Sequence, residues 1–88
     1  MTSMSDLLGA GLLKSGEDLI WYRRTSGQTY RAVVNNDGSL TTGDGVKHRT
    51  PSGAAKHFSN KPIDGWNCWK IENSGVTLVE LRTLFQSS

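Results

Sequence analysis

The sequence has little cysteine and no long hydrophobic run. Cys68 is the only cysteine among the 88 residues, which excludes an internal disulfide and a metal site built from several thiolates. No stretch approaches the ~20 apolar residues that a membrane-spanning helix needs. The N-terminus also lacks the basic start and the apolar run of a secretory signal peptide. We therefore expect a protein of a reducing compartment, the cytoplasm, and we expect no metal and no other cofactor.

Hydrophobic residues make up 35% of the chain and aromatic residues 8%, so the core must be small. A chain of 88 residues suffices for one domain. We expect this domain to cover residues 1–88, with its core between residues 5 and 84, and the tryptophans to supply much of its buried area. The net charge of +2 is mildly basic, which permits an anionic partner without requiring one.

Glycine is abundant, with ten copies, and predicts many turns. Alternating apolar and polar residues predict strands over residues 18–24, 29–35, 39–42 and 66–72. Helical spacing and capping residues predict helices over residues 5–13, 51–59 and 78–85. Tight turns between consecutive strands imply antiparallel pairing. The prediction is an α+β fold, with a small antiparallel sheet of about four strands and three short helices.

The run Thr50-Pro51-Ser52 is a strong signal for the start of a helix. Thr50 can cap the helix because its side-chain oxygen can accept a backbone N–H of the first turn. Pro51 fits the first helical position, where its missing N–H costs nothing. Such a start presents N–H groups and the positive end of the helix dipole, which favours an anion. Plain capping without a ligand is the alternative, and residue types alone favour it because nearly every helix needs a cap.

Basic residues cluster in the middle of the sequence, with Arg23, Arg24 and Arg31 on the predicted hairpin and Lys47, His48, Arg49, Lys56 and Lys61 around this helix start. His48 and Arg49 precede the cap, and Lys56 follows it. A phosphate at the helix start could accept hydrogen bonds from the backbone, from the hydroxyls of Thr50 and Ser52, and from Arg49. Such contacts are expected because most protein–DNA hydrogen bonds go to the phosphate backbone. The alternative is that these charges form a solvated surface, and residue types alone favour that alternative as well.

Two tryptophans, Trp66 and Trp69, stand three residues apart on the last predicted strand and should therefore point to opposite faces. We predict that Trp69 lies in the core and that Trp66 lies nearer the site. Arg82, on the last helix, has two alternative roles, a phosphate contact or a salt bridge with Glu80 or Asp64. The full set of candidate nucleic-acid-binding residues is His48, Arg49, Thr50, Ser52, Lys56, Trp66 and Arg82.

Catalytic signals are weak in this sequence. Cys68 could form a nucleophile pair with His48 or His57, but it lies between two tryptophans in a predicted core strand, where a small buried hydrophobe is expected. No carboxylates are paired at helical spacing. The glycine-rich turn at residues 43–45 lacks the strand–loop–helix frame of a phosphate-binding loop. We therefore expect no enzymatic activity.

Five motifs follow one another over nearly the whole chain, from about residue 5 to residue 84. They are Gly11-Leu12-Leu13; Gly27, Tyr30, Ala32, Val34, Asp37 and Gly38; Thr50-Pro51-Ser52-Gly53-Ala54-Ala55; Asp64-Gly65-Trp66 with Trp69; and Leu78, Glu80, Leu81 and Arg82. In this order they resemble the RAMA domain, the restriction system adenine methylase-associated domain. Thr50 stands where that family usually has serine, which keeps the hydroxyl. Asp64 stands where it usually has asparagine, which adds a negative charge.

The resemblance implies a non-catalytic accessory module of a DNA modification or restriction system. Such a module would bind double-stranded DNA beside a methyltransferase or restriction partner, with sensing of methylated adenine as a further implication. The alternative is a protein-interaction or dimerisation module that docks on a methyltransferase, which predicts an exposed apolar patch around Trp66 or around Leu84 and Phe85. A small nuclease is a third class, and it would require metal-dependent cutting.

Overall fold

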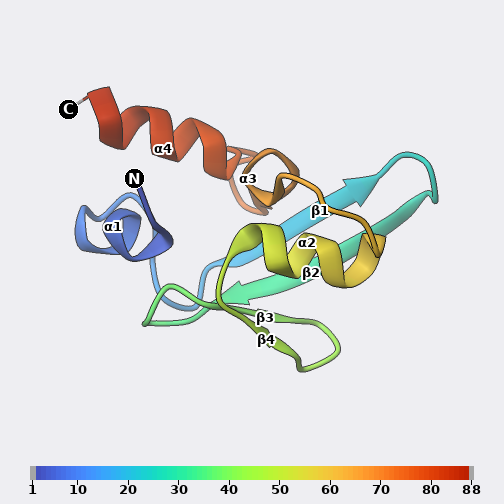
Figure 1. The fold of residues 1–88 in the computed structure, drawn as a ribbon. Helices are drawn as coiled ribbons and strands as arrows, with labels where there is room; N and C mark the ends of the chain where they lie inside the picture. Colours follow the sequence, from blue (N-terminus) through green and yellow to red (C-terminus); the bar gives the residue numbers. More distant parts are fainter. Residues whose placement is uncertain (1, 88) are drawn as a thin grey trace.

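The computed structural model describes residues 2–87, which form an α+β fold (Figure 1). Its strands are β1 (Asp18–Arg23), β2 (Gln28–Val34), β3 (Leu40–Thr42), β4 (Lys47–His48) and β5 (Lys70–Ile71). They form one antiparallel sheet of five strands in the order β4-β3-β2-β1-β5. Its helices are α1 (Met4–Gly9), α2 (Pro51–Ser59), α3 (Gly65–Cys68) and α4 (Leu78–Ser87). The predicted class and the antiparallel sheet are confirmed, although the described residues contain one strand and one helix more than expected.

One face of the sheet is buried and the other is open to solvent. Leu19 lies opposite Ala32 in the β1–β2 pair, and both are buried together with Trp21. The residues between them point the other way, because successive side chains of a strand lie on opposite faces. Tyr22 and Val33 belong to this second face and expose 55% and 39% of their surface. The helices therefore build the core with one side of the sheet, and the other side stays available to a partner.

The helix α2 follows its predicted bounds because its local signals agree. Thr50 is extended, and its hydroxyl accepts the backbone N–H of Gly53 at 3.0 Å. Asn60 ends the helix in the left-handed conformation, with φ 58°. Ala54 and Ala55 are fully buried between the helix and the rest of the core. These small side chains allow the helix to approach the sheet closely.

The long strand predicted over residues 66–72 is wrong, because the chain forms α3 and then only the two-residue strand β5. The carboxylate of Asp64 begins the helix, since it accepts the backbone N–H of Trp66 at 3.1 Å and the side-chain N–H of Asn67 at 2.6 Å. The two tryptophans therefore do not lie on opposite faces of one strand. Trp69 is fully buried, as predicted, whereas Trp66 is half-buried on α3.

The terminal helices differ in detail from the prediction. The helix α1 begins and ends earlier than expected, because Ser3 rather than Ser5 caps it and exchanges hydrogen bonds with Asp6. The helix α4 starts after Thr77, as predicted, and the Thr77 hydroxyl accepts the backbone N–H of Glu80 at 3.3 Å. Within residues 2–87, none of the helices has the length and apolar character needed to cross a bilayer.

Candidate nucleic-acid interface

The helix α3 packs directly on the first turn of α2. The backbone N–H of Gly65 donates to the Ser52 hydroxyl at 3.1 Å, and the indole N–H of Trp69 donates to the Pro51 carbonyl at 3.1 Å. Gly65 is so close that a Cβ atom on it would lie 2.0 Å from the Pro51 carbonyl oxygen. This close approach is the reason that glycine is required at position 65. The backbone conformation is not the reason, since the φ of Gly65 is not positive. The end of α2 that was predicted as an anion site is therefore built from two separate segments.

The first turn of α2 is closed by the protein's own groups, which differs from the open helix start expected from the sequence. The hydroxyl of Thr50 accepts the N–H of Gly53 at 3.0 Å, and its carbonyl accepts the next N–H of the helix at 3.1 Å. Pro51 has no N–H. The nitrogen of Ser52 lies under Gly65, since a Cβ atom added to Gly65 would be 2.5 Å from it. The backbone donors that make a helix start attractive to an anion are thus already used or covered.

What remains accessible at this end of α2 is a set of side chains. Arg49 and Thr50 are exposed, whereas Ser52 is half-buried and accepts the hydrogen bond from α3. The exposed carboxylate of Asp64 follows the same junction and is used as the cap of α3. A phosphate near this end would therefore be held by Arg49 and its basic neighbours, and not by the helix backbone.

Arg82 lies over the ring of Trp66, with its guanidinium carbon 5.0 Å from the ring centroid. This is a cation–π contact, and it joins α4 to α3. Neither of the predicted salt bridges, with Glu80 or with Asp64, is formed among the described residues. The structure thus brings together Trp66 and Arg82, two residues of the candidate set, and leaves the charge of Arg82 without a carboxylate partner within residues 2–87.

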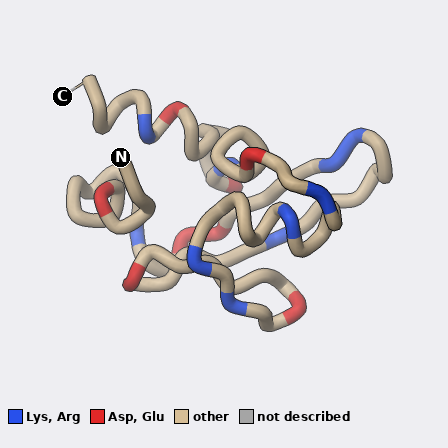
Figure 2. Tube along the Cα trace, in the orientation of Figure 1, with Lys and Arg blue, Asp and Glu red and all other residues tan. Residues whose placement is uncertain are grey.

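Most basic side chains of the described part of the chain have no carboxylate partner. Of the ten Lys and Arg residues, only Arg31 and Lys47 form ion pairs, with Glu72 at 2.6 Å and with Asp37 at 3.1 Å. Four uncompensated residues flank α2, lie on it or approach it from the end of β1, and Figure 2 shows Lys and Arg along these segments. We call this group the α2 cation surface, and it consists of Arg23, Arg49, Lys56 and Lys61.

Two members of the α2 cation surface, Arg23 and Lys61, were not among the candidate residues. The hairpin returns beside the C-terminal half of α2, where Tyr30 stacks on Phe58 with ring centroids 4.1 Å apart. The guanidinium of Arg23 donates to the Phe58 carbonyl at 3.5 Å. This approach joins segments 35 residues apart, so no local pattern could reveal it. The sequence showed both residues as part of the basic cluster in the middle of the chain, but it gave no reason to choose them as contacts.

His48, a candidate contact residue, is directed toward the protein's own groups. Its Nε2 is buried and has no hydrogen-bond partner within residues 2–87, and its ring centroid lies 4.8 Å from that of His57. The Nε2 of His57 is 2.5 Å from the carboxylate of Asp44, which also accepts the Thr42 hydroxyl. These two hydrogen bonds lower the pKa of Asp44 to about 2. Burial lowers the pKa of His48 and His57 lowers it further, whereas Asp44 raises it.

Acid should therefore destabilise the domain through His48. A group whose pKa is lowered by folding stabilises the fold above its unfolded-state pKa, which is about 6.5 for histidine, and this stability is lost as the pH falls below that value. We expect the Tm to fall between about pH 8 and about pH 5.5, and to fall less in His48→Leu. Thermal unfolding followed by circular dichroism measures both. An equal fall in the two proteins would show that other groups cause the acid sensitivity.

Cys68 lies half-buried on α3, and not in a core strand as predicted. Burial raises the pKa of its thiol, and the neighbouring carboxylate of Asp64 raises it further. The thiol therefore stays protonated near neutral pH, and a protonated thiol is a poor nucleophile. Its environment offers no support for covalent chemistry.

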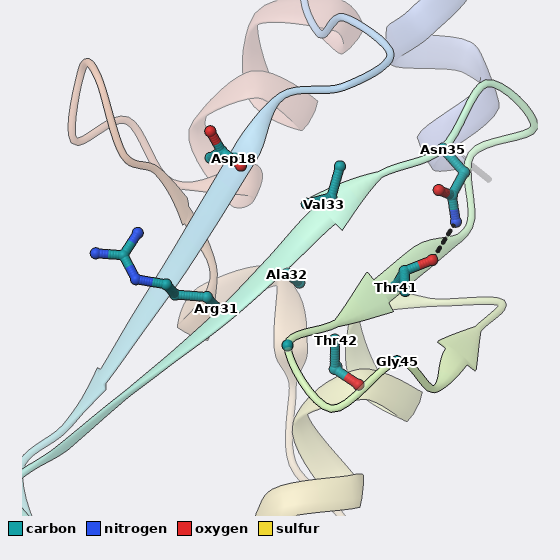
Figure 3. A pocket seen from close by; sticks show the side chains of 9 residues that line it. Asp18, Arg31, Ala32, Val33, Asn35, Thr41, Thr42 and Gly45 are labelled. Atoms are coloured by element: carbon teal, nitrogen blue, oxygen red, sulfur yellow. Dashed lines mark hydrogen bonds between the residues drawn. The ribbon is translucent and has the colours of Figure 1, made fainter.

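The exposed face of the sheet carries a separate hollow of about 570 Å³ between β2 and β3 (Figure 3). Its charged residues are Arg31 and Asp18, and Arg31 is neutralised by Glu72 at 2.6 Å. The side chain of Asn35 donates to the Thr41 hydroxyl at 2.9 Å on its rim. None of the candidate nucleic-acid-binding residues lines this hollow.

Comparison with known families gives a match over the entire length of the sequence. The family model described as Restriction Enzyme Adenine Methylase Associated, RAMA, matches residues 1–88. No curated protein matches the sequence. The matched region includes α2, its contact with α3, and the α2 cation surface.

Proposed function

The chain belongs to the RAMA family, and on this premise we propose that it is a non-catalytic accessory domain that binds double-stranded DNA. Its family links it to adenine-methylase restriction systems, so the expected partner is a methyltransferase or a restriction enzyme. The observation that carries the proposal is the α2 cation surface, because none of its members has a carboxylate partner within residues 2–87.

The dimensions of α2 suit a row of phosphates. Its nine residues span about 13 Å, and cations lie before it, on it and after it. Duplex DNA carries one negative charge per about 1.7 Å of its axis, so several phosphates fall within the length of this surface. Binding would release counterions from the DNA, which gives affinity without dependence on base sequence. This mode of contact needs exposed side chains, and it does not need free backbone N–H groups.

Within this proposal, the five candidate residues on α2 and just before it have two roles. Arg49 and Lys56 are exposed and contact phosphate directly. The other members position them: Thr50 caps α2 beside Arg49, Ser52 ties α2 to α3, and His48 packs beneath the same segment. The caps and contacts matter because a cation held on a rigid element loses less side-chain freedom on binding.

Trp66 and Arg82 form the second part of the proposed interface. The guanidinium rests on the indole at 5.0 Å from the ring centroid, so a positive charge and an aromatic surface are presented together. Phosphate contacts fix the position of a protein on DNA, but bases are recognised by other groups. A preference for methylated adenine is the finer part of the proposal, and competition between methylated and unmethylated duplexes of one sequence tests it.

A salt titration tests duplex binding directly. We expect affinity to fall steeply as salt rises, with a log–log slope that corresponds to roughly three to six neutralised phosphates. Fluorescence anisotropy of a labelled duplex of about 20 base pairs measures this slope between about 50 and 200 mM salt. Arg49→Ala and Lys56→Ala should each weaken binding and reduce the slope by about one.

The matched control is Lys14→Ala, which removes the same charge from the exposed turn between α1 and β1. Its slope should equal that of the wild type, because Lys14 lies outside the α2 cation surface. If Lys14→Ala weakened binding as much as Lys56→Ala, net charge and not this surface would explain the affinity. No binding at low salt would contradict the proposed function itself.

One observation favours the alternative of a protein-interaction module. Leu84 exposes 55% of its surface on α4, where it lines a shallow groove of about 360 Å³ with Val79, Glu80 and Thr83. An exposed apolar side chain beside such a groove is typical of a contact with another protein. This alternative predicts self-association or methyltransferase binding that depends weakly on salt, together with no duplex binding in the titration above.

A further inference from the structure

One edge of β1 is paired over only part of its length. Its neighbour β5 is only two residues long and pairs with β1 at Leu19 and Ile20. The chain before β5 is coiled into α3, so the rest of β1 has no strand partner on this side within the described residues. A pocket of about 390 Å³ occupies the gap between β1 and α3, which lie close together in Figure 1. The wrongly predicted long strand would have filled it.

The residues that line this pocket include two cations and no carboxylate, although the carboxylate of Asp64 accepts a hydrogen bond from Asn67 of its wall. Its lining residues are Trp21, Tyr22, Arg24, Asn67, Cys68, Lys70 and Thr77. Neither Arg24 nor Lys70 forms an ion pair among residues 2–87. The larger hollow between β2 and β3 differs in this respect, because its one cation is neutralised and it contains Asp18. The pocket beside β1 therefore suits an anionic ligand better.

An exposed aromatic ring lies between the two cations. Lys70 is paired with Ile20, so it lies diagonally across from Tyr22 on the same face of the sheet. Arg24 follows Tyr22 by two residues, just past the end of β1. Tyr22 exposes 55% of its surface and lies opposite Thr29 in the sheet. The ring is thus held on a paired strand and stays open on its outer side.

The pocket also offers polar groups of both kinds. The side-chain N–H of Asn67 is already donated to Asp64 at 2.6 Å, which leaves its carbonyl oxygen to accept a hydrogen bond. The hydroxyl oxygen of Thr77 accepts the N–H of Glu80 at 3.3 Å, which leaves its proton to donate. The lining of the pocket therefore includes an acceptor and a donor as well as the aromatic ring.

We propose that this pocket binds a single nucleotide, with its base on the ring of Tyr22 and its phosphate between Arg24 and Lys70. Proteins hold unpaired nucleotides in this way, by stacking bases on aromatic rings and contacting the backbone with cations. The volume lies within the usual range for small-molecule pockets, about 300–1,000 Å³. The ligand can be a free nucleotide or an unpaired base of a DNA strand, and only the second source rests on the proposed DNA-binding function.

The test uses deoxyadenosine monophosphate and two labelled duplexes, one fully paired and one with a single unpaired adenine. Titration of the ¹⁵N-labelled protein with the nucleotide should shift the amide signals of Tyr22, Asn67 and Lys70. Tyr22→Ala should weaken nucleotide binding by at least about fivefold, and Lys70→Gln should weaken it as well. Lys14→Ala is the matched charge control and should bind the nucleotide like the wild type. The amide spectrum of each variant shows that it is folded.

The outcomes separate the pocket from the duplex interface. If the unpaired adenine raises duplex affinity in the wild type but not in Tyr22→Ala, the pocket takes a base of DNA. If only the free nucleotide responds to Tyr22→Ala, the pocket takes the free form. If the paired duplex binds with the expected salt dependence but neither ligand responds to Tyr22→Ala, the pocket proposal is overturned and the DNA-binding proposal stands. If the nucleotide binds and responds to Tyr22→Ala but no duplex binds, the DNA-binding proposal is overturned and the pocket proposal stands.

Discussion

Gly65→Ala is expected to leave the domain unfolded or barely stable. The new Cβ atom would lie 2.0 Å from the carbonyl oxygen of Pro51, 2.2 Å from its carbonyl carbon and 2.5 Å from the nitrogen of Ser52. All three are backbone atoms of α2, so no side chain can rotate away. The helix α3 would have to move off α2, which also breaks the hydrogen bond from Gly65 to the Ser52 hydroxyl. We expect a loss of at least about 3 kcal/mol.

Such a loss is a large part of the stability of a domain of this size. Urea unfolding followed by circular dichroism measures it, and Gly9→Ala is the matched control. Gly9 ends α1, its φ is not positive, and an added Cβ atom would meet nothing within 4 Å. Because alanine favours helix over glycine, by up to about 1 kcal/mol in a helix interior, Gly9→Ala should not lose stability. A Gly65→Ala protein with the wild-type unfolding midpoint would mean that α3 does not press on α2 in solution.

Trp69→Ala is the second substitution with a large expected effect. The side chain of Trp69 is fully buried, packs edge-on against Trp21 with ring centroids 5.9 Å apart, and donates its indole N–H to the Pro51 carbonyl at 3.1 Å. Truncation leaves a cavity and also removes the indole donor from the Pro51 carbonyl. Removing a buried tryptophan or phenylalanine side chain in this way costs about 3–5 kcal/mol. Urea unfolding by far-ultraviolet circular dichroism is the suitable measurement, because tryptophan fluorescence would change with the substitution itself.

Two further variants separate the causes of this loss. Trp69→Phe keeps much of the apolar volume but removes the donor to Pro51, so it should cost an intermediate amount, of which about 0.5–1.5 kcal/mol reflects the lost hydrogen bond. Tyr22→Ala removes an aromatic ring from the exposed face of the sheet and should change stability by no more than about 0.5 kcal/mol. If Trp69→Ala cost as little as Tyr22→Ala, Trp69 would not be part of the core.

The local signals of α2 show how much of the fold could be predicted. Thr50 and Pro51 at its start and Asn60 at its end act through neighbouring backbone groups, so they could be recognised in the sequence. The β1–β2 hairpin could be predicted in the same way, because alternation of apolar and polar residues is a local pattern. The strand predicted after Asp64 was wrong because it also relied on a local pattern alone. Its alternating residues resembled a strand, while a helix of four residues is too short to show helical periodicity.

The candidate site illustrates the other limit. The local signals at Thr50 predicted an open helix start, yet its donors are occupied or covered because α3 lies on it. That contact joins residues 13 positions apart, and no property of either segment alone requires it. The contact of Arg82 with Trp66 and the position of Arg23 beside the end of α2 also depend on tertiary packing. The candidate residues were chosen because they are close in the sequence, whereas a charged surface is formed by residues that are close in space.

The amino-acid sequence by itself determined the α+β class, the antiparallel sheet, the bounds of α2 and the membership of the RAMA family. Each of these depends on local backbone preferences, on the period of apolar residues, or on motifs in a fixed order. Only the tertiary structure decided that α3 closes the start of α2, which cations remain without partners, and that a pocket opens beside β1. These features arise where distant segments meet, and their free energy depends on contacts that no single stretch of the chain contains.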